Sequence, residues 1–92
     1  MKLFGYWRAE DDLYRAVNYI RERNPIAAED AKAHLRSAVN HLQRFPDAGR
    51  RGRKFGTREI VVPEYHYIIR YRVKDNAIQI LRIFHTSRQW TY

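Results

Sequence analysis

Apolar residues recur at a helical period in the first half of the chain. The first stripe predicts a helix that ends near Arg23, and its members are Leu13, Ala16, Val17 and Ile20. The acidic run from Glu10 to Asp12 precedes this stripe, where the positive end of a helix dipole stabilises negative charge. A helix therefore begins near this acidic run.

A second apolar stripe predicts a second helix, which extends to about residue 45. Its members are Ala28, Ala31, Leu35, Ala38, Leu42 and Phe45. Asn24 suits the N-cap of this helix and Pro25 its first position, so the same dipeptide ends one helix and starts the next. The small alanine side chains allow the two helices to approach closely as an antiparallel hairpin.

After Pro46 the spacing of the apolar residues changes from that of a helix to that of β-strands. Runs rich in β-branched and aromatic residues cover 58–62, 67–73 and 77–85, and a shorter run covers 2–6. Residues 74–77 form a plausible tight turn, because Asp75 and Asn76 tolerate turn geometry. The order β-α-α-β-β-β predicts a single α+β domain over residues 1–92. In it, the helical hairpin packs on a mainly antiparallel sheet of about four strands.

If Asp75 and Asn76 form a two-residue loop, the last two predicted strands pair in a defined register. Because side chains alternate across a strand, this pair of strands then has two unlike faces. The face expected to meet the helices carries Tyr67, Ile69, Tyr71, Val73, Ile78, Ile80, Arg82 and Phe84. The opposite face carries His66, Ile68, Arg70, Arg72, Gln79, Leu81, Ile83 and His85. With only two helices available, its apolar centre is expected to lie uncovered inside a cationic border. Such a surface suggests a partner site, made of Ile68, Arg70, Arg72, Leu81 and Ile83. A register shift of one residue would change this set.

Basic residues are concentrated after residue 30. The first thirty residues carry six acids and five bases, whereas the remaining sixty-two carry a net charge of +9. The segment Arg50–Arg58 holds five basic residues and no acid. Charge of this density attracts nucleic acid or an acidic protein, although a merely solvated surface is the alternative.

The composition also narrows the class of protein. There is no cysteine, so disulfides and thiolate metal sites are excluded. No apolar run approaches the length of a membrane span, and no signal-peptide segment begins the chain, so we expect a soluble, cytoplasmic protein. The glycines lack phosphate-loop spacing, and His34 and His41 have no carboxylate placed to complete a metal site. We therefore expect neither a metal nor another cofactor.

The last residues hold side chains that are able to carry out phosphodiester chemistry. A metal-free ribonuclease would use His85 or Tyr92 as acid or base and Arg82 or Arg88 to stabilise the phosphorane. In the alternative interpretation, His85 is a strand-end residue bonded to a nearby carbonyl, while Trp90 and Tyr92 pack the tail against a helix.

Several short motifs occur in the order found in a known family. They are Ala9-x-x-Asp12-Leu13, Asn24-Pro25-x-Ala27-Ala28, Phe45-Pro46-x-x-Gly49-Arg50-x-Gly52, Gly56-Thr57-Arg58-Glu59, Tyr67-x-Ile69-x-Tyr71-Arg72-Val73 and Ile80-Leu81-Arg82-Ile83-x-His85-x-x-Arg88-x-Trp90. Together they cover nearly the whole chain. The sequence resembles the RelE/ParE superfamily, the toxins of type II toxin–antitoxin modules, whose element order is the one predicted above.

The resemblance implies one of two activities. RelE-like members cleave mRNA on the ribosome without a metal, and ParE-like members poison DNA gyrase. RelE-like ribonucleases typically carry an arginine that aligns with Ile68, and lysines on the preceding strand, which here is the lysine-free segment 59–62. These departures favour the ParE-like branch. The RelE-like ribonuclease is the alternative, and a non-toxic basic module that binds nucleic acid is a second one.

Either branch implies a small acidic antitoxin that wraps the toxin. The predicted partner face is the surface expected to bind it. The expected target surface, for gyrase with its DNA or for the ribosome and mRNA, consists of Arg50, Arg51, Arg53, Lys54, Arg58, His85, Arg88 and Trp90.

Overall fold

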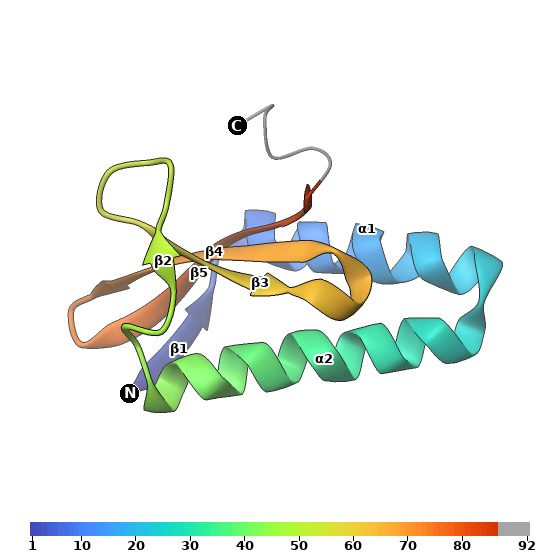
Figure 1. Ribbon diagram of the computed structural model, residues 1–92, viewed down its shortest axis with the longest axis horizontal. Helices are drawn as coiled ribbons and strands as arrows, with labels where there is room; N and C mark the ends of the chain where they lie inside the picture. The colour runs from blue at the N-terminus through green and yellow to red at the C-terminus, as the bar shows by residue number, and fades with distance from the viewer. Residues whose placement is uncertain (87–92) are drawn as a thin grey trace.

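The computed structural model describes residues 1–86 and contains the predicted elements in the predicted order. They are β1 (Lys2–Gly5), α1 (Trp7–Arg23), α2 (Pro25–Arg44), β2 (Arg50–Arg51), β3 (Arg58–Val62), the 3-10 turn η1 (Pro63–Tyr65), β4 (Tyr67–Lys74) and β5 (Ala77–His85). Figure 1 shows the two helices running side by side as a hairpin next to the sheet. The α+β prediction is confirmed, and the sequence reading missed only the two short elements β2 and η1.

The junction between the helices has the predicted capping. The Asn24 side chain accepts a hydrogen bond from the N–H of Ala27 at 3.1 Å, and Pro25 begins α2. Ala28 and Ala31 are completely buried, as close approach of the two helices requires. The hairpin is therefore fixed by local sequence signals.

The sheet has the strand order β1-β5-β4-β3-β2. β1 pairs in parallel with β5, and the other neighbours are antiparallel. The two-residue loop between β4 and β5 is confirmed, because Asp75 and Asn76 both adopt the positive φ angles of a type I′ turn, 53° and 59°. The core lies between the sheet and the helices, and its largest completely enclosed side chains include Leu42, Ile69, Tyr71 and Ile78.

The predicted faces hold only as far as a bulge in β5. Tyr71 pairs with Ile80, but its neighbour Arg70 pairs with Arg82, so Leu81 is an extra residue in β5. An extra residue turns every later side chain to the other face. Ile83 consequently lies in the core, and its predicted position on the face away from the helices, which we call the open face, is wrong.

Because of the same bulge, the predicted positions of three further side chains are wrong. Arg82 and Phe84 move to the face away from the helices, and His85 moves to the helix side, opposite Tyr67. The expected uncovered apolar centre is wrong as well, because Ile68 is only 1% exposed and stands between Val61 and Phe84 in the strand register. The face away from the helices therefore exposes less apolar surface than its sequence suggested.

Among residues 1–86, no helix has the length and apolar character needed to cross a membrane.

Candidate functional site on the open face of the sheet

A row of charged side chains crosses the open face. Arg50, Glu59, Arg70 and Arg82 stand opposite one another on four successive strands. The Arg70 guanidinium donates twice to one Glu59 oxygen, at 3.2 and 2.9 Å, and also lies 5.0 Å from the centre of the Phe84 ring. Arg70 and Glu59 are 2% and 5% exposed, so the middle of this face is a buried ion pair. Arg50 approaches the second Glu59 oxygen at 3.7 Å.

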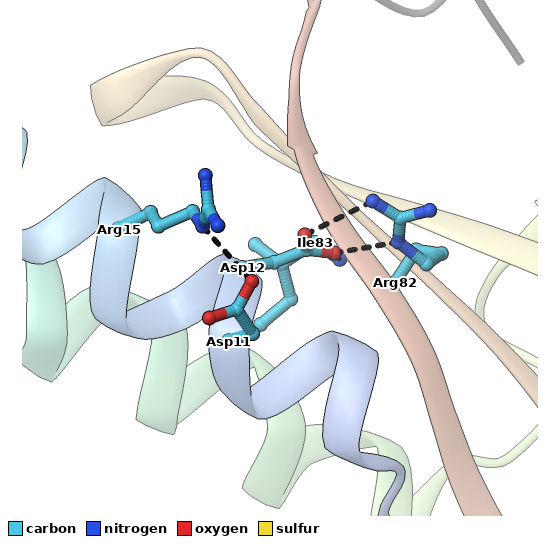
Figure 2. A network of polar contacts seen from close by, with 5 residues as sticks. All are labelled: Asp11, Asp12, Arg15, Arg82 and Ile83. Atoms are coloured by element: carbon cyan, nitrogen blue, oxygen red, sulfur yellow. Dashed lines mark hydrogen bonds and ion pairs between the residues drawn. The ribbon is translucent and has the colours of Figure 1, made fainter.

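Asp12 of α1 holds the end of this row (Figure 2). Its carboxylate accepts two hydrogen bonds from Arg82, at 2.7 and 3.0 Å, and a third from the backbone N–H of Ile83 at 2.9 Å. β1 pairs with β5 only as far as Ile80. Asp12 therefore accepts a hydrogen bond from a backbone N–H of β5, that of Ile83, which lies beyond the part paired with β1. Arg82, a predicted phosphate-stabilising residue, is therefore already bound to a carboxylate.

A cationic hollow of about 360 Å³ lies beside this row. It is lined by Tyr6, Trp7, Arg8, Lys54, Arg70, Arg72, Leu81 and Arg82. Arg72 donates to Gln79 at 2.6 Å and to the Tyr6 hydroxyl at 3.2 Å, both neutral partners. Within residues 1–86, none of Arg8, Lys54 and Arg72 is ion-paired with a carboxylate. The hollow therefore combines concave shape with uncompensated positive charge.

The hollow brings together residues that the sequence had assigned to different roles. Arg70, Arg72 and Leu81 belonged to the predicted antitoxin-binding set, Lys54 to the target surface, and Arg82 to the ribonuclease candidates. Of the other antitoxin-binding candidates, Ile68 is buried on this face and Ile83 lies in the core, and neither lines the hollow.

Three lining residues were missed: Tyr6, Trp7 and Arg8. They follow β1, and only the pairing of β1 with β5 places them here. The available signal was a pair of adjacent aromatic residues before an arginine, at the end of the predicted strand 2–6.

Hydrogen bonds fix the chain at Gly49, just before the basic segment 50–58; we call this point the root of the segment. The Tyr71 hydroxyl donates to the Pro46 carbonyl and accepts from the Gly49 N–H, both at 2.8 Å, and Arg58 donates to the Gly49 carbonyl at 2.7 Å. Burial is the main cause of the raised pKa of Tyr71. A side chain on Gly49 would overlap the Tyr71 ring, so the loop can enter the sheet here only through a glycine.

His85 lies at the other end of the sheet from this basic segment. Its ring packs edge-on against Tyr67 at 5.4 Å and lies 6.1 Å from the ring of His66. His85 pairs with Tyr67, and Arg58 of the basic segment pairs with Tyr71. Because Tyr67 and Tyr71 are four residues apart along β4, His85 is separated from Arg58 by about 13 Å along the strand direction. The structure thus does not join His85 to the basic segment in one site. The other tail candidates, Arg88, Trp90 and Tyr92, lie outside the described residues.

No group of three or more His, Asp or Glu side chains within residues 1–86 is arranged to hold a metal ion.

Comparison with known proteins gives this geometry a family. The family model described as the ParE toxin of the type II toxin–antitoxin system parDE matches residues 7–90. The chain belongs to this ParE toxin family. It is thus a type II toxin of the wider RelE/ParE superfamily, and the resemblance found in the sequence is confirmed.

Individual relatives agree with the assignment to the RelE/ParE superfamily. Toxin RelE2 of Caulobacter vibrioides is 37% identical over 82 residues, which cover 89% of this chain and 91% of the relative. A putative toxin, Y4kP, of Sinorhizobium fredii is 39% identical over 72 residues, covering 78% and 74% of the two chains. A solved structure of the chromosomal ParDE system from P. aeruginosa superposes with a TM-score of 0.84 at 28% identity, covering 92% of this chain and 95% of that one.

Proposed function

We propose that this ParE-family toxin poisons DNA gyrase in the cytoplasm and is neutralised by an acidic antitoxin. Two observations favour gyrase over mRNA. Ile68, which aligns with the arginine of RelE-like ribonucleases, is buried and uncharged. The preceding strand β3 has no lysine, and its one acid, Glu59, is paired with Arg70. Two of the phosphate-binding positions typical of the ribonuclease branch are therefore unfilled on these two strands.

The cationic hollow is the proposed binding site of the antitoxin. The observation that carries this proposal is that Arg8, Lys54 and Arg72, which line the same hollow, have no carboxylate partner within residues 1–86. An acidic segment would supply those carboxylates, and an apolar side chain beside them would cover Leu81 and Trp7. Electrostatic complementarity of this kind speeds association and selects the partner.

One experiment separates the two targets. The purified toxin is incubated with gyrase and supercoiled DNA, and in parallel with a translating extract. We expect gyrase-dependent DNA cleavage and intact mRNA. Cleavage of ribosome-bound mRNA at codons, with gyrase supercoiling unaffected, would make the gyrase assignment wrong.

The antitoxin site is tested by charge reversal. The protein encoded next to the toxin is titrated against the Arg72→Glu variant and against Arg36→Glu, which changes an exposed arginine on α2. We expect the hollow variant to bind at least about tenfold more weakly, equivalent to about 1.4 kcal/mol, and the α2 variant to bind like wild type. Equal binding by both variants would place the antitoxin elsewhere.

A ribonuclease remains the second candidate, because of a smaller cavity at the end of β5. This cavity, of about 260 Å³, is lined by His85 with Tyr67, Tyr19, Arg15 and Asp12, among others. A histidine beside an arginine suits acid–base chemistry on a phosphodiester. If this is the active site, His85→Ala will lower the rate of mRNA cleavage by about 10² or more, whereas a gyrase poison will keep its activity.

A further inference from the structure

The hairpin formed by β2 and β3 ends in a tip of defined shape. The Gly52 N–H donates to the Thr57 carbonyl at 2.8 Å, which closes the base of the tip. The Thr57 N–H and hydroxyl both donate to the Lys54 carbonyl, at 3.1 and 2.6 Å. Gly56 adopts a φ of 79°, a conformation that other residues rarely take. Together with the root at Gly49 and Tyr71, these bonds hold the tip in one conformation.

This tip presents one aromatic ring to solvent. Phe55 is fully exposed, with no atom of its neighbours covering it, and Figure 1 shows its loop standing away from the sheet. A single exposed phenylalanine is ordinary on a protein surface. Here, however, it stands directly after Arg53 and Lys54, and the acid nearest in sequence on either side, Asp47 or Glu59, lies outside the tip. The tip is thus a rigid apolar wedge within a cationic ribbon.

We propose that the β2–β3 hairpin is a duplex-DNA-binding arm. In this proposal, Phe55 enters between two base pairs from the minor groove while Arg51 and Lys54 contact neighbouring phosphates. Proteins that bend DNA combine these two parts, an apolar side chain that separates a base step and cations that bind the backbone. The inference deepens the proposed function and rests on it for its setting, because a gyrase poison acts where gyrase holds DNA.

The distribution of charge favours DNA over the other anionic partners. An anionic membrane would be bound best by several apolar side chains beside the cations, whereas this tip has one. An acidic protein segment has its complement in the concave hollow, where Arg8 and Arg72 converge and which Lys54 also lines. A narrow ribbon that ends in a single ring fits a groove whose walls are phosphates.

The binding test uses the purified full chain and a duplex of about 20 base pairs with a central TA step, a step that is easily unstacked. One adenine of this step is replaced by 2-aminopurine, whose fluorescence rises on unstacking. We expect wild-type toxin to bind and to raise the fluorescence. Phe55→Ala should bind at least about tenfold more weakly and leave the fluorescence unchanged, and Phe55→Leu should retain both effects because leucine is also a wedge. Lys54→Ala should lower the salt dependence of log K by about 0.9, the value for one phosphate contact.

Matched controls make the test specific. Phe45→Ala removes another exposed phenylalanine, at the end of α2, and should change neither binding nor fluorescence. Far-ultraviolet circular dichroism confirms that each variant is folded. The proposal is overturned if wild type does not bind the duplex, if Phe55→Ala behaves like wild type, or if Phe55 is needed only for binding to vesicles of phosphatidylserine and phosphatidylcholine.

The gyrase assay distinguishes failure of this inference from failure of the proposed function. If Phe55→Ala loses duplex binding and wild type does not stimulate gyrase-dependent cleavage, the DNA arm stands and gyrase is the wrong target. If Phe55→Ala binds duplex like wild type while wild type poisons gyrase, the arm is refuted and the gyrase function stands.

Discussion

Removal of the Asp12 carboxylate should strongly destabilise the toxin. Asp12→Ala deletes two charge-assisted hydrogen bonds to Arg82 and the acceptor for the N–H of Ile83. A broken buried ion pair costs about 3–5 kcal/mol, and an orphaned backbone donor about 1–3 kcal/mol. Because the Arg82 and Asp12 side chains are 24% and 13% exposed, this ion pair is worth less than a fully buried one, about 2 kcal/mol, and with about 1 kcal/mol for the backbone donor we expect a total loss of about 3 kcal/mol. For a domain of this size that lowers the melting temperature by about 15 °C.

The isosteric change separates the two contributions. Asp12→Asn keeps one oxygen for the Ile83 N–H but loses the charge and one of the two acceptors for Arg82, so it should cost about 2 kcal/mol. Urea unfolding followed by circular dichroism measures both variants. The neighbouring Asp11 provides the control, because its ion pair with Arg15 has side chains 46% and 78% exposed. Asp11→Asn should change the stability by no more than about 0.5 kcal/mol. An Asp12→Ala variant as stable as the Asp11 variant would refute the reasoning.

Three other substitutions test the rest of the fold. Gly49→Ala should destabilise the toxin by about 2 kcal/mol or more in urea unfolding, because the new methyl group overlaps the Tyr71 ring. Glu59→Gln should cost about 3 kcal/mol, measured in the same way, since it removes the negative charge of Glu59 from the buried ion pair with Arg70. His34 accounts for a pH effect: its pKa is raised above 6.5, chiefly by its bond to the Asp30 carbonyl. The stability it contributes is therefore complete below about pH 6.5 and is lost as the pH rises through the folded-state pKa. His34→Gln should make the urea midpoint change less between about pH 6 and pH 8.

The elements that the sequence predicted well are those with local causes. Asn24 and Pro25 mark the junction of the two helices by capping and by the fixed φ of proline, and Asp75 with Asn76 marks the turn by tolerance of positive φ. Each signal acts within a few residues of the structure it produces, so it can be read without knowledge of the rest of the chain.

The positions that were wrong depend on a single residue whose effect is not local. Leu81 continues the run of β-branched and aliphatic residues in β5, and nothing in its chemistry marks it as a bulge. Its extra length exchanges the faces of Arg82 and Ile83, and with them the expected partner surface. The bulge lies at the point in β5 just past the end of β1, where Asp12 takes over the strand edge from β1. This constraint exists only in the folded domain.

The cationic hollow was only partly predictable for a related reason. Arg70 and Arg72 were identified on the correct face because the extra residue lies in β5 and leaves the side-chain alternation of β4 unchanged. Trp7 and Arg8 reach the hollow from the opposite end of the chain, through pairing that no sequence period reveals.

The parallel pairing of β1 with β5 also determines when the toxin can form. Lys2 pairs with Ala77 and Gly5 with Ile80, so each contact joins residues seventy-five positions apart. Closing a loop of this length carries a large entropic cost, and contacts this distant in sequence slow folding. During synthesis, β1 therefore remains unpaired until the ribosome has made β5. The wall of the hollow formed by Tyr6, Trp7 and Arg8 is thus completed among the last steps, and the nascent chain lacks this surface for most of its translation.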